Sequence, residues 1–273
     1  MRSRTLQPQA SGDETTVNHQ ETPRPAPSRW SLSDLGYFIA FSASWLLFSN
    51  FLTLAGYAAL RPILGWHTPL PALRTNAYFA VISQTVFYGP LFGYIYYLVA
   101  VRYGLRFWTA LNWGKLTRRR LLRFFLGGIL LAFAAARAPA LLPDKDSFPL
   151  RQFFTSPAAA YAVAAFAVLV APFMEELIFR GVLFNIFERQ VGVGFAILST
   201  ALLFAGFHVP EYWGAWNHLL LVSVAGGVFS LTRGVTRSLA SSVILHLAYN
   251  ATLMAALFFD THHFHSFGAM AIF

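Results

Sequence analysis

The stretch Tyr161–Phe187, YAVAAFAVLVAPFMEELIFRGVLFNIF, is almost wholly apolar yet contains Glu175, Glu176 and Arg180 near its centre. It is long enough to cross a bilayer as one helix, because roughly 20 apolar residues suffice. Ionised groups at membrane depth cost at least about 2.5–3.5 kcal/mol each, so they persist mainly where they serve a function. The stretch therefore predicts a transmembrane helix that carries either a functional site or ion pairs that hold helices together.

Helix geometry separates the two glutamates. Glu176 precedes Arg180 by four residues, which is the favourable order for an ion pair on one helix face. Glu175 points about 100° away from Glu176 at 3.6 residues per turn, toward a different neighbour. We expect Glu176 and Arg180 to form a structural ion pair that leaves Glu175 free for another role.

The composition is that of a polytopic membrane protein, with 56% hydrophobic residues, 11% charged residues and a mean hydropathy of +0.53. No cysteine is present, so disulfides and thiolate metal sites are excluded. The fold class predicted is an all-α transmembrane bundle of about seven spans, with an eighth short helix possible near the C-terminus. The seven apolar runs are Leu35–Leu60, Ala77–Val101, Leu121–Leu142, Tyr161–Phe187, Gly194–Phe207, Leu219–Thr232 and Leu239–Phe259.

Four regions follow from this pattern. Residues 1–30 are polar and proline-rich, which predicts a disordered tail. Residues 31–157 hold the N-terminal transmembrane helices, 158–259 hold a transmembrane core that contains the polar residues discussed below, and 260–273 form a C-terminal tail. The tail contains His262-His263-Phe264-His265, which is similar to a metal-binding tract but is interpreted as a solvated segment.

The distribution of basic residues predicts the orientation. Of the 20 Lys and Arg residues, 14 lie in the N-terminal tail and in the loops that would share its side, and five lie on the opposite side, with Arg180 set aside. Seven of the 14 occupy the loop from Arg102 to Arg123. Short loops rich in Lys and Arg stay cytoplasmic, so the N-terminus is predicted to be cytoplasmic. The run Lys115–Arg120 is interpreted as a membrane anchor, and no nucleic-acid partner is expected.

Two further polar pairs stand in apolar runs: Phe204 with His208, and His246 with Asn250, each four residues apart on one helix face. Taken singly, each histidine or asparagine could simply hydrogen-bond across a helix interface. Their depth in the membrane suggests that they belong to one site. Glu175 and His208 each lie 16 residues from the Val191-Gly192 turn, which is roughly 24 Å at 1.5 Å per residue. Both would therefore reach a similar depth.

The three motifs, in order and in separate apolar runs, resemble the motif set of the CAAX prenyl endopeptidase type 2 family, also called the CPBP or Abi family of intramembrane proteases. The motifs are Glu-Glu-x-x-x-Arg from Glu175, Phe-x-x-x-His from Phe204 and His-x-x-x-Asn from His246. The family includes proteins of bacteriocin self-immunity. The resemblance covers about residues 158–255, and the segment Arg237-Ser238-Leu239 is also similar to the family's approach to its third motif.

The resemblance implies hydrolysis of a peptide bond within the membrane, with Glu175, His208, His246 and Asn250 as the catalytic residues. Glu175 would be the general base that activates water, and His208 would hold that water or share its proton. His246 and Asn250 would donate hydrogen bonds to the oxyanion of the tetrahedral intermediate.

A metal-dependent alternative stays open at this point. Glu175, His208 and His246 could ligate zinc, with Asn250 as a weaker fourth ligand, as in a metalloprotease. The sequence lacks His-Glu-x-x-His, so the usual argument for a zinc protease is not available. No organic cofactor is expected.

The expected substrate is a membrane-associated or prenylated protein or peptide, and the expected location is the plasma membrane of a prokaryote. Two other classes of function remain. One is a non-catalytic membrane scaffold or immunity protein. The other is a transporter, because intramembrane acids and histidines also build proton relays. The absence of inverted repeats and paired broken helices in the sequence disfavours a transporter.

Overall fold

The computed structural model describes residues 31–137 and 149–266, and within these ranges it contains helices and no strand. The predicted disordered tail of residues 1–30 lies outside the described residues. The α-helices are α1 Leu32–Leu64, α2 Ala77–Tyr96, α3 Phe107–Ala110, α4 Arg118–Arg137, α5 Pro157–Ala165, α6 Ala171–Glu176, α7 Phe184–Gln190, α8 Val193–His208, α9 Trp216–Thr236 and α10 Leu239–Asp260. Short 3₁₀ and π segments are η1 Leu70–Thr75, η2 Tyr97–Arg102, η4 Pro149–Phe153, η5 Phe166–Val170 and η6 Leu177–Leu183.

Four helical segments are long and apolar enough to cross a membrane: Leu32–Leu64, Pro157–Gln190, Trp216–Thr236 and Leu239–Asp260. The described residues of the other three predicted runs also lie in helices, but these helices do not meet both requirements, and residues 138–142 of the third run lie outside the described residues. Helix α8 has only 16 residues, α4 begins with three arginines, and α2 is interrupted by Gln84 and several tyrosines. The described residues therefore form an all-helical protein with four candidate spans, and the number of about seven stays a prediction.

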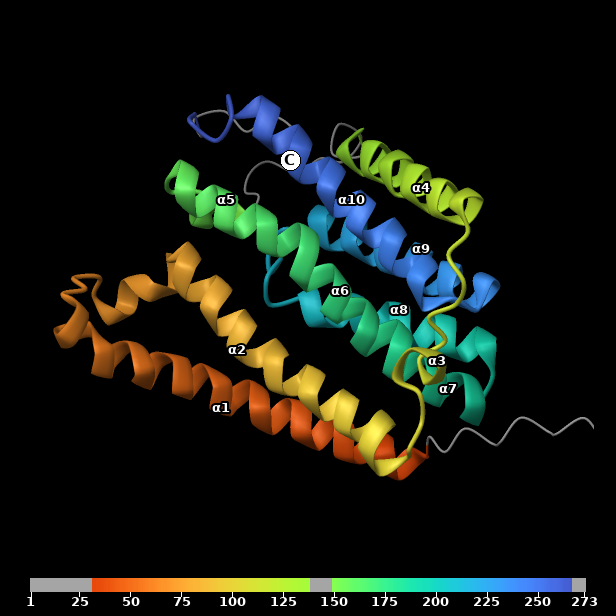
Figure 1. The fold of residues 1–273 in the computed structure, drawn as a ribbon. Coiled ribbons are helices and arrows are strands. Elements are labelled where there is room, and N and C mark those ends of the chain that lie inside the picture. The colour runs from red at the N-terminus through yellow and green to blue at the C-terminus, as the bar shows by residue number, and fades with distance from the viewer. Residues whose placement is uncertain (1–30, 138–148, 267–273) are drawn as a thin grey trace, which may run out of the picture.

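The helices pack side by side with alternating direction (Figure 1). The continuous helix formed by α5, η5, α6, η6 and α7 runs through the middle, and it contacts α2, α8 and α10. Helix α1 packs on α2 at one side of the bundle, and α4 packs on α10 at the other. Because the segment that carries Glu175 and Glu176 is central, its polar groups are surrounded by protein.

Glycine permits the close approach of α4 to α10. A Cβ atom added to Gly128 would lie 2.3 Å from the carbonyl oxygen of Leu245 and 2.7 Å from Cβ of Ala248. No real side chain tolerates such distances, so only glycine lets the two backbones approach this closely. A Cβ atom added to the neighbouring Gly127 would lie 3.8 Å from Cδ1 of Leu245, which leaves room for a methyl group.

Pro172 accounts for the widened π turn η5 just before the glutamate pair. Proline has no amide hydrogen and its ring crowds the carbonyl four residues earlier, so the regular hydrogen-bond ladder breaks there. The amide of Ala171 accordingly donates to the carbonyl of Phe166, five residues back. The carbonyl of Ala167 thereby loses both of its possible helical donors, and a side chain from another helix can reach it.

The start of the C-terminal segment is folded back. Helix α10 ends at Asp260, and residues His262, His263 and Phe264 all adopt positive φ angles. This turn returns Phe264 to a small apolar cluster with Phe154 and Leu257, where it is buried. His262, His263 and His265 are exposed, whereas Phe264 is buried because its aromatic ring gains apolar contacts there. The possible eighth helix falls largely on residues 267–273, outside the described residues.

Candidate functional site

The carboxylate of Glu176 is fully buried and accepts hydrogen bonds from three side chains. Nη1 of Arg180 donates to Oε1 at 2.9 Å, and Nδ1 of His246 lies 3.0 Å from the same oxygen. The hydroxyl of Ser242 donates to Oε2. An ion pair with additional hydrogen bonds is the arrangement in which a buried carboxylate remains charged. The expected pair of Glu176 with Arg180 is present, and it forms one part of a larger network.

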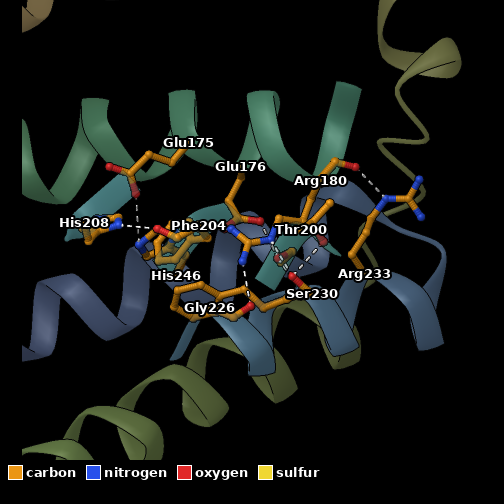
Figure 2. Close-up of polar contacts among 12 residues, drawn as sticks. Glu175, Glu176, Arg180, Thr200, Phe204, His208, Gly226, Ser230, Arg233 and His246 are labelled. Atoms are coloured by element: carbon orange, nitrogen blue, oxygen red, sulfur yellow. Dashed lines mark hydrogen bonds and ion pairs between the residues drawn. The ribbon is translucent and has the colours of Figure 1, made fainter. Parts of the chain in front are cut away.

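Arg180 connects this network to α9. Its side chain is completely buried and donates to the carbonyl of Gly226 at 2.7 Å and to the hydroxyl of Ser230 at 3.2 Å (Figure 2). The hydroxyl of Thr200 on α8 donates in turn to Ser230 at 3.0 Å. The guanidinium carbon also lies 4.6 Å from the ring centre of Phe204, within the range of a cation–π contact. Arg180 thus joins three helices at one depth.

His246 lies between the two glutamates. Its Nδ1 faces Oε1 of Glu176 at 3.0 Å, and its Nε2 lies 3.8 Å from Oε2 of Glu175. An ionised carboxylate can only accept, so Nδ1 carries a proton, and Nε2 faces Glu175. The imidazole stacks on Phe229 at 4.2 Å between ring centres, and the ring is held in this orientation.

His208 and Asn250 are each held by a backbone carbonyl. Nδ1 of His208 lies 2.7 Å from the carbonyl oxygen of Phe204, which assigns a proton to Nδ1 and leaves Nε2 available. Nδ2 of Asn250 donates to the carbonyl oxygen of Ala167 at 2.8 Å, which is the carbonyl freed by the π turn before Pro172. One amide hydrogen of Asn250 remains for another acceptor.

A cavity of about 420 Å³ brings these groups together. Glu175, His208, His246 and Asn250 all line it, along with mostly apolar and aromatic side chains from α2, α5, α8, α9 and α10. The Glu175 side chain is 18% exposed, whereas Glu176 is fully buried. The two adjacent glutamates therefore differ in the way that helix geometry predicts: one reaches the cavity and the other stays in the packed interior.

Glu211, interpreted from the sequence as an ordinary loop carboxylate, also lines the cavity. It lies in the turn between α8 and α9, within electrostatic reach of His208 and Glu175. The residue as a whole is exposed, but desolvation at the cavity mouth raises the pKa of its carboxyl, His208 opposes this rise and Glu175 adds to it. A carboxylate therefore stands at the boundary of the cavity.

The possible zinc site fits the structure less well. His208 has Nε2 available, and His246 contacts the carboxylate of Glu176 through Nδ1. Metal-binding histidines share these features. In residues 31–137 and 149–266, however, no three His, Cys, Asp or Glu side chains are grouped so that they could hold a metal ion. We therefore derive no chemical step through zinc.

Several residues that contribute to the site were not predicted from the sequence. Tyr88 on α2 is buried and lines the cavity together with Glu175, while Thr200, Ser230 and Ser242 complete the buried network. A signal for two of them was present, because Thr200-Phe204-His208 and Ser242-His246-Asn250 each repeat at four-residue spacing along one helix face. These four-residue repeats were recognised only in part, since serine and threonine are common in membrane helices without any functional role.

Taken together, the apolar helices and the polar cavity between them define a helical integral membrane protein with a candidate hydrolytic site. A family model described as type II CAAX prenyl endopeptidase, Rce1-like, matches residues 157–252, from the start of α5 to the middle of α10. This match confirms, for residues 157–252, the resemblance indicated by the three motifs. It supports an intramembrane protease at the level of the family. No curated protein and no solved structure matches the chain.

Proposed function

We propose that this protein is an intramembrane endopeptidase that hydrolyses a peptide bond of a membrane-associated protein or peptide with a water molecule activated by Glu175 and His208. The observation that carries the proposal is the cavity of about 420 Å³ that Glu175, His208, His246 and Asn250 line together. The matched family domain gives the reaction class. A site of this kind, apolar with a few convergent polar groups, is the usual form of a catalytic pocket.

The proposed reaction begins with proton transfer from water to Glu175, which general-base catalysis accelerates by roughly 10²–10⁴-fold. The water oxygen then bonds to the carbonyl carbon of the substrate, and the carbonyl oxygen becomes an oxyanion. When the carbon–nitrogen bond breaks, the proton moves from Glu175 to the departing amine. His208, with Nε2 available at the cavity, would position the water and share this proton.

Asn250 and His246 are proposed to stabilise the oxyanion. Asn250 has one amide hydrogen left beyond its bond to Ala167, and its orientation is already set by that bond. His246 would donate from Nε2 as an imidazolium, whose charge the carboxylate of Glu176 stabilises through Nδ1. Glu176 and Arg180 are proposed to position His246 without touching the substrate.

The proposed orientation places the N-terminus in the cytoplasm and the protein in the plasma membrane of a prokaryote, with about seven spans. The basic loop between α2 and α4 supports this orientation. Helices α2, α4 and α8 would complete the seven spans, because each is an apolar or partly apolar helix that packs against a candidate span.

Cleavage by purified protein in detergent tests the proposal. The protein is incubated with libraries of membrane-protein segments and of prenylated peptides, and products are identified by mass spectrometry. Glu175→Gln should abolish cleavage, while Glu188→Gln, a matched change at the far end of the same continuous helix, should leave it intact. Each assay is repeated with a chelator and with added zinc. Loss of activity in the chelator with recovery in zinc would favour the metal-dependent alternative, and the absence of any cleavage would favour a non-catalytic scaffold or immunity protein.

A further inference from the structure

We infer that the cavity opens at the membrane face opposite the basic loops, so that its substrate is a membrane-associated protein or exported peptide whose cleaved segment lies on the non-cytoplasmic side. This inference rests on the proposed function and on the proposed orientation. It adds the side from which the substrate enters, and it follows from which end of each helix lines the cavity and how the other end is closed.

The lining residues extend from the middle of the bundle toward one end. On helices that run away from that end, they lie between the start and a point just past the middle, as in residues 80–88 of α2, 163–175 of the central helix and 222–229 of α9. On helices that run toward it, they lie in the middle and later parts, as in Phe204 and His208 of α8 and residues 246–254 of α10. The α1–α2 connection, the start of α5 and the end of α10 lie at this same end (Figure 1).

Polar and exposed residues lie at the outer boundary of the cavity. Gln84 on α2 is exposed, and Glu211 is exposed in the loop between α8 and α9. Phe153 of η4, in the segment that precedes α5, lines the same region. A glutamine amide and a carboxylate are costly to place against hydrocarbon, so both are expected to meet water or substrate. The cavity is therefore accessible from this end.

The opposite end is closed by the loop around α3. The amides of Leu239 and Ala240 at the start of α10 donate to the carbonyls of Asn112 and Trp113 at 2.8 and 3.0 Å. The side chain of Asn112 donates to Oδ1 of Asn185 at 3.0 Å. These bonds join the α3–α4 loop to both α10 and α7, so the loop covers the ends of the catalytic helices on the basic side.

A buried charged layer lies beneath that loop. Arg233 is fully buried, and it donates to Oδ1 of Asn185 at 2.7 Å. It also donates to the carbonyl of Arg180 at 3.1 Å (Figure 2). Glu176 and Arg180 are also fully buried. A substrate that approached from the basic side would have to break this network, which would leave buried charges without partners.

The basic loops indicate on which side of the membrane the closed end lies. The loop from Arg102 to Arg123 contains seven of the 20 basic residues and is expected to stay in the cytoplasm. The C-terminus of a cytosolic prenylated protein would therefore meet the closed end of the bundle. A segment held at the outer surface of the membrane would meet the open end, beside Gln84 and Glu211.

Single-cysteine labelling tests the inference directly, because the chain contains no cysteine. Gln84→Cys reports on the cavity mouth, and two exposed positions serve as controls: His67→Cys in the α1–α2 connection and Lys115→Cys in the basic loop. A membrane-impermeant maleimide is applied to intact spheroplasts and, separately, to inverted membrane vesicles. Gln84→Cys and His67→Cys should be labelled in spheroplasts and lose that labelling in inverted vesicles, and Lys115→Cys should show the reverse.

Three results would overturn the inference. Labelling of Gln84→Cys from the same side as Lys115→Cys would place the mouth at the cytoplasmic face. Labelling of Lys115→Cys in spheroplasts would reverse the orientation. No labelling of Gln84→Cys in either preparation, with both controls labelled, would show that the cavity is not open to water. Failure of the proposed protease function appears separately, as the absence of cleavage in detergent, where both faces are accessible.

Discussion

The two neighbouring glutamates should respond very differently to the same substitution. Glu176→Gln removes a charge from a fully buried carboxylate that accepts hydrogen bonds from Arg180, His246 and Ser242. The glutamine oxygen can still accept from Arg180, and Arg180 keeps its bonds to α9. What is lost is the only acidic group paired with the buried guanidinium among the described residues. Breaking a buried ion pair in this way costs about 3–5 kcal/mol.

Glu175→Gln should cost far less stability. The Glu175 side chain is partly exposed to the cavity, and its closest approach to His246, at 3.8 Å, is longer than a hydrogen bond. We expect its destabilisation to stay within about 1 kcal/mol, which is typical of an ion pair that retains contact with solvent. Cleavage should nevertheless be abolished, because the proposed general base is lost.

Equilibrium unfolding in mixed micelles, followed by the fluorescence of the seven tryptophans, measures the difference between the two variants. A double variant, Glu176→Gln with Arg180→Met, serves as the control. It should be less destabilised than the sum of the single changes, because removing both charges leaves no unpaired charge. Equal stability of Glu175→Gln and Glu176→Gln would refute the assignment of one glutamate to the cavity and the other to the interior.

Three further predictions follow from the packing and the cavity. Gly128→Ala should destabilise the protein by about 1–3 kcal/mol, because its Cβ would clash with the Leu245 carbonyl. Gly127→Ala should be neutral or stabilising by up to about 1 kcal/mol in the same unfolding assay. Asn250→Ala should lower kcat by roughly 10²-fold with a smaller change in KM, and Asn250→Asp should be no better unless zinc restores it, which would contradict the metal-free mechanism. Tyr88→Phe should lower the cleavage rate roughly tenfold by removing the hydroxyl of a tyrosine that lines the cavity with Glu175, and an unchanged rate would exclude a positioning role.

Local features of the chain were predictable because their cause lies within one helix. Within the described residues the apolar runs lie in helices, and the four-residue spacing of Glu176 and Arg180 places them in contact. The equal distance of Glu175 and His208 from the turn between α7 and α8 predicted a shared depth, and both side chains line the same cavity. Composition, periodicity and spacing are sufficient for such features.

The number of spans and the course of the C-terminal segment were less predictable. Helix α4 begins with arginines, so its composition is not that of a membrane span. Helix α8 is too short to be counted as a span. Phe264 is buried by contacts with Phe154 and Leu257, and Phe154 lies more than a hundred residues earlier in the chain. Such contacts have no signature in the local pattern of hydrophobic residues.

The composition and the three motifs were enough to indicate a helical membrane protein similar to CAAX proteases over residues 157–252, because each depends on residue type and on short spacings. Only the tertiary structure could assign the partners within the site. His246 and Ser242 reach Glu176 from α10, and Asn250 reaches the carbonyl of Ala167 that the turn before Pro172 leaves free. These bonds depend on how far each helix is rotated and shifted against its neighbours. That arrangement is set by the packing of the whole bundle, which also closes one end of the cavity and leaves the other open.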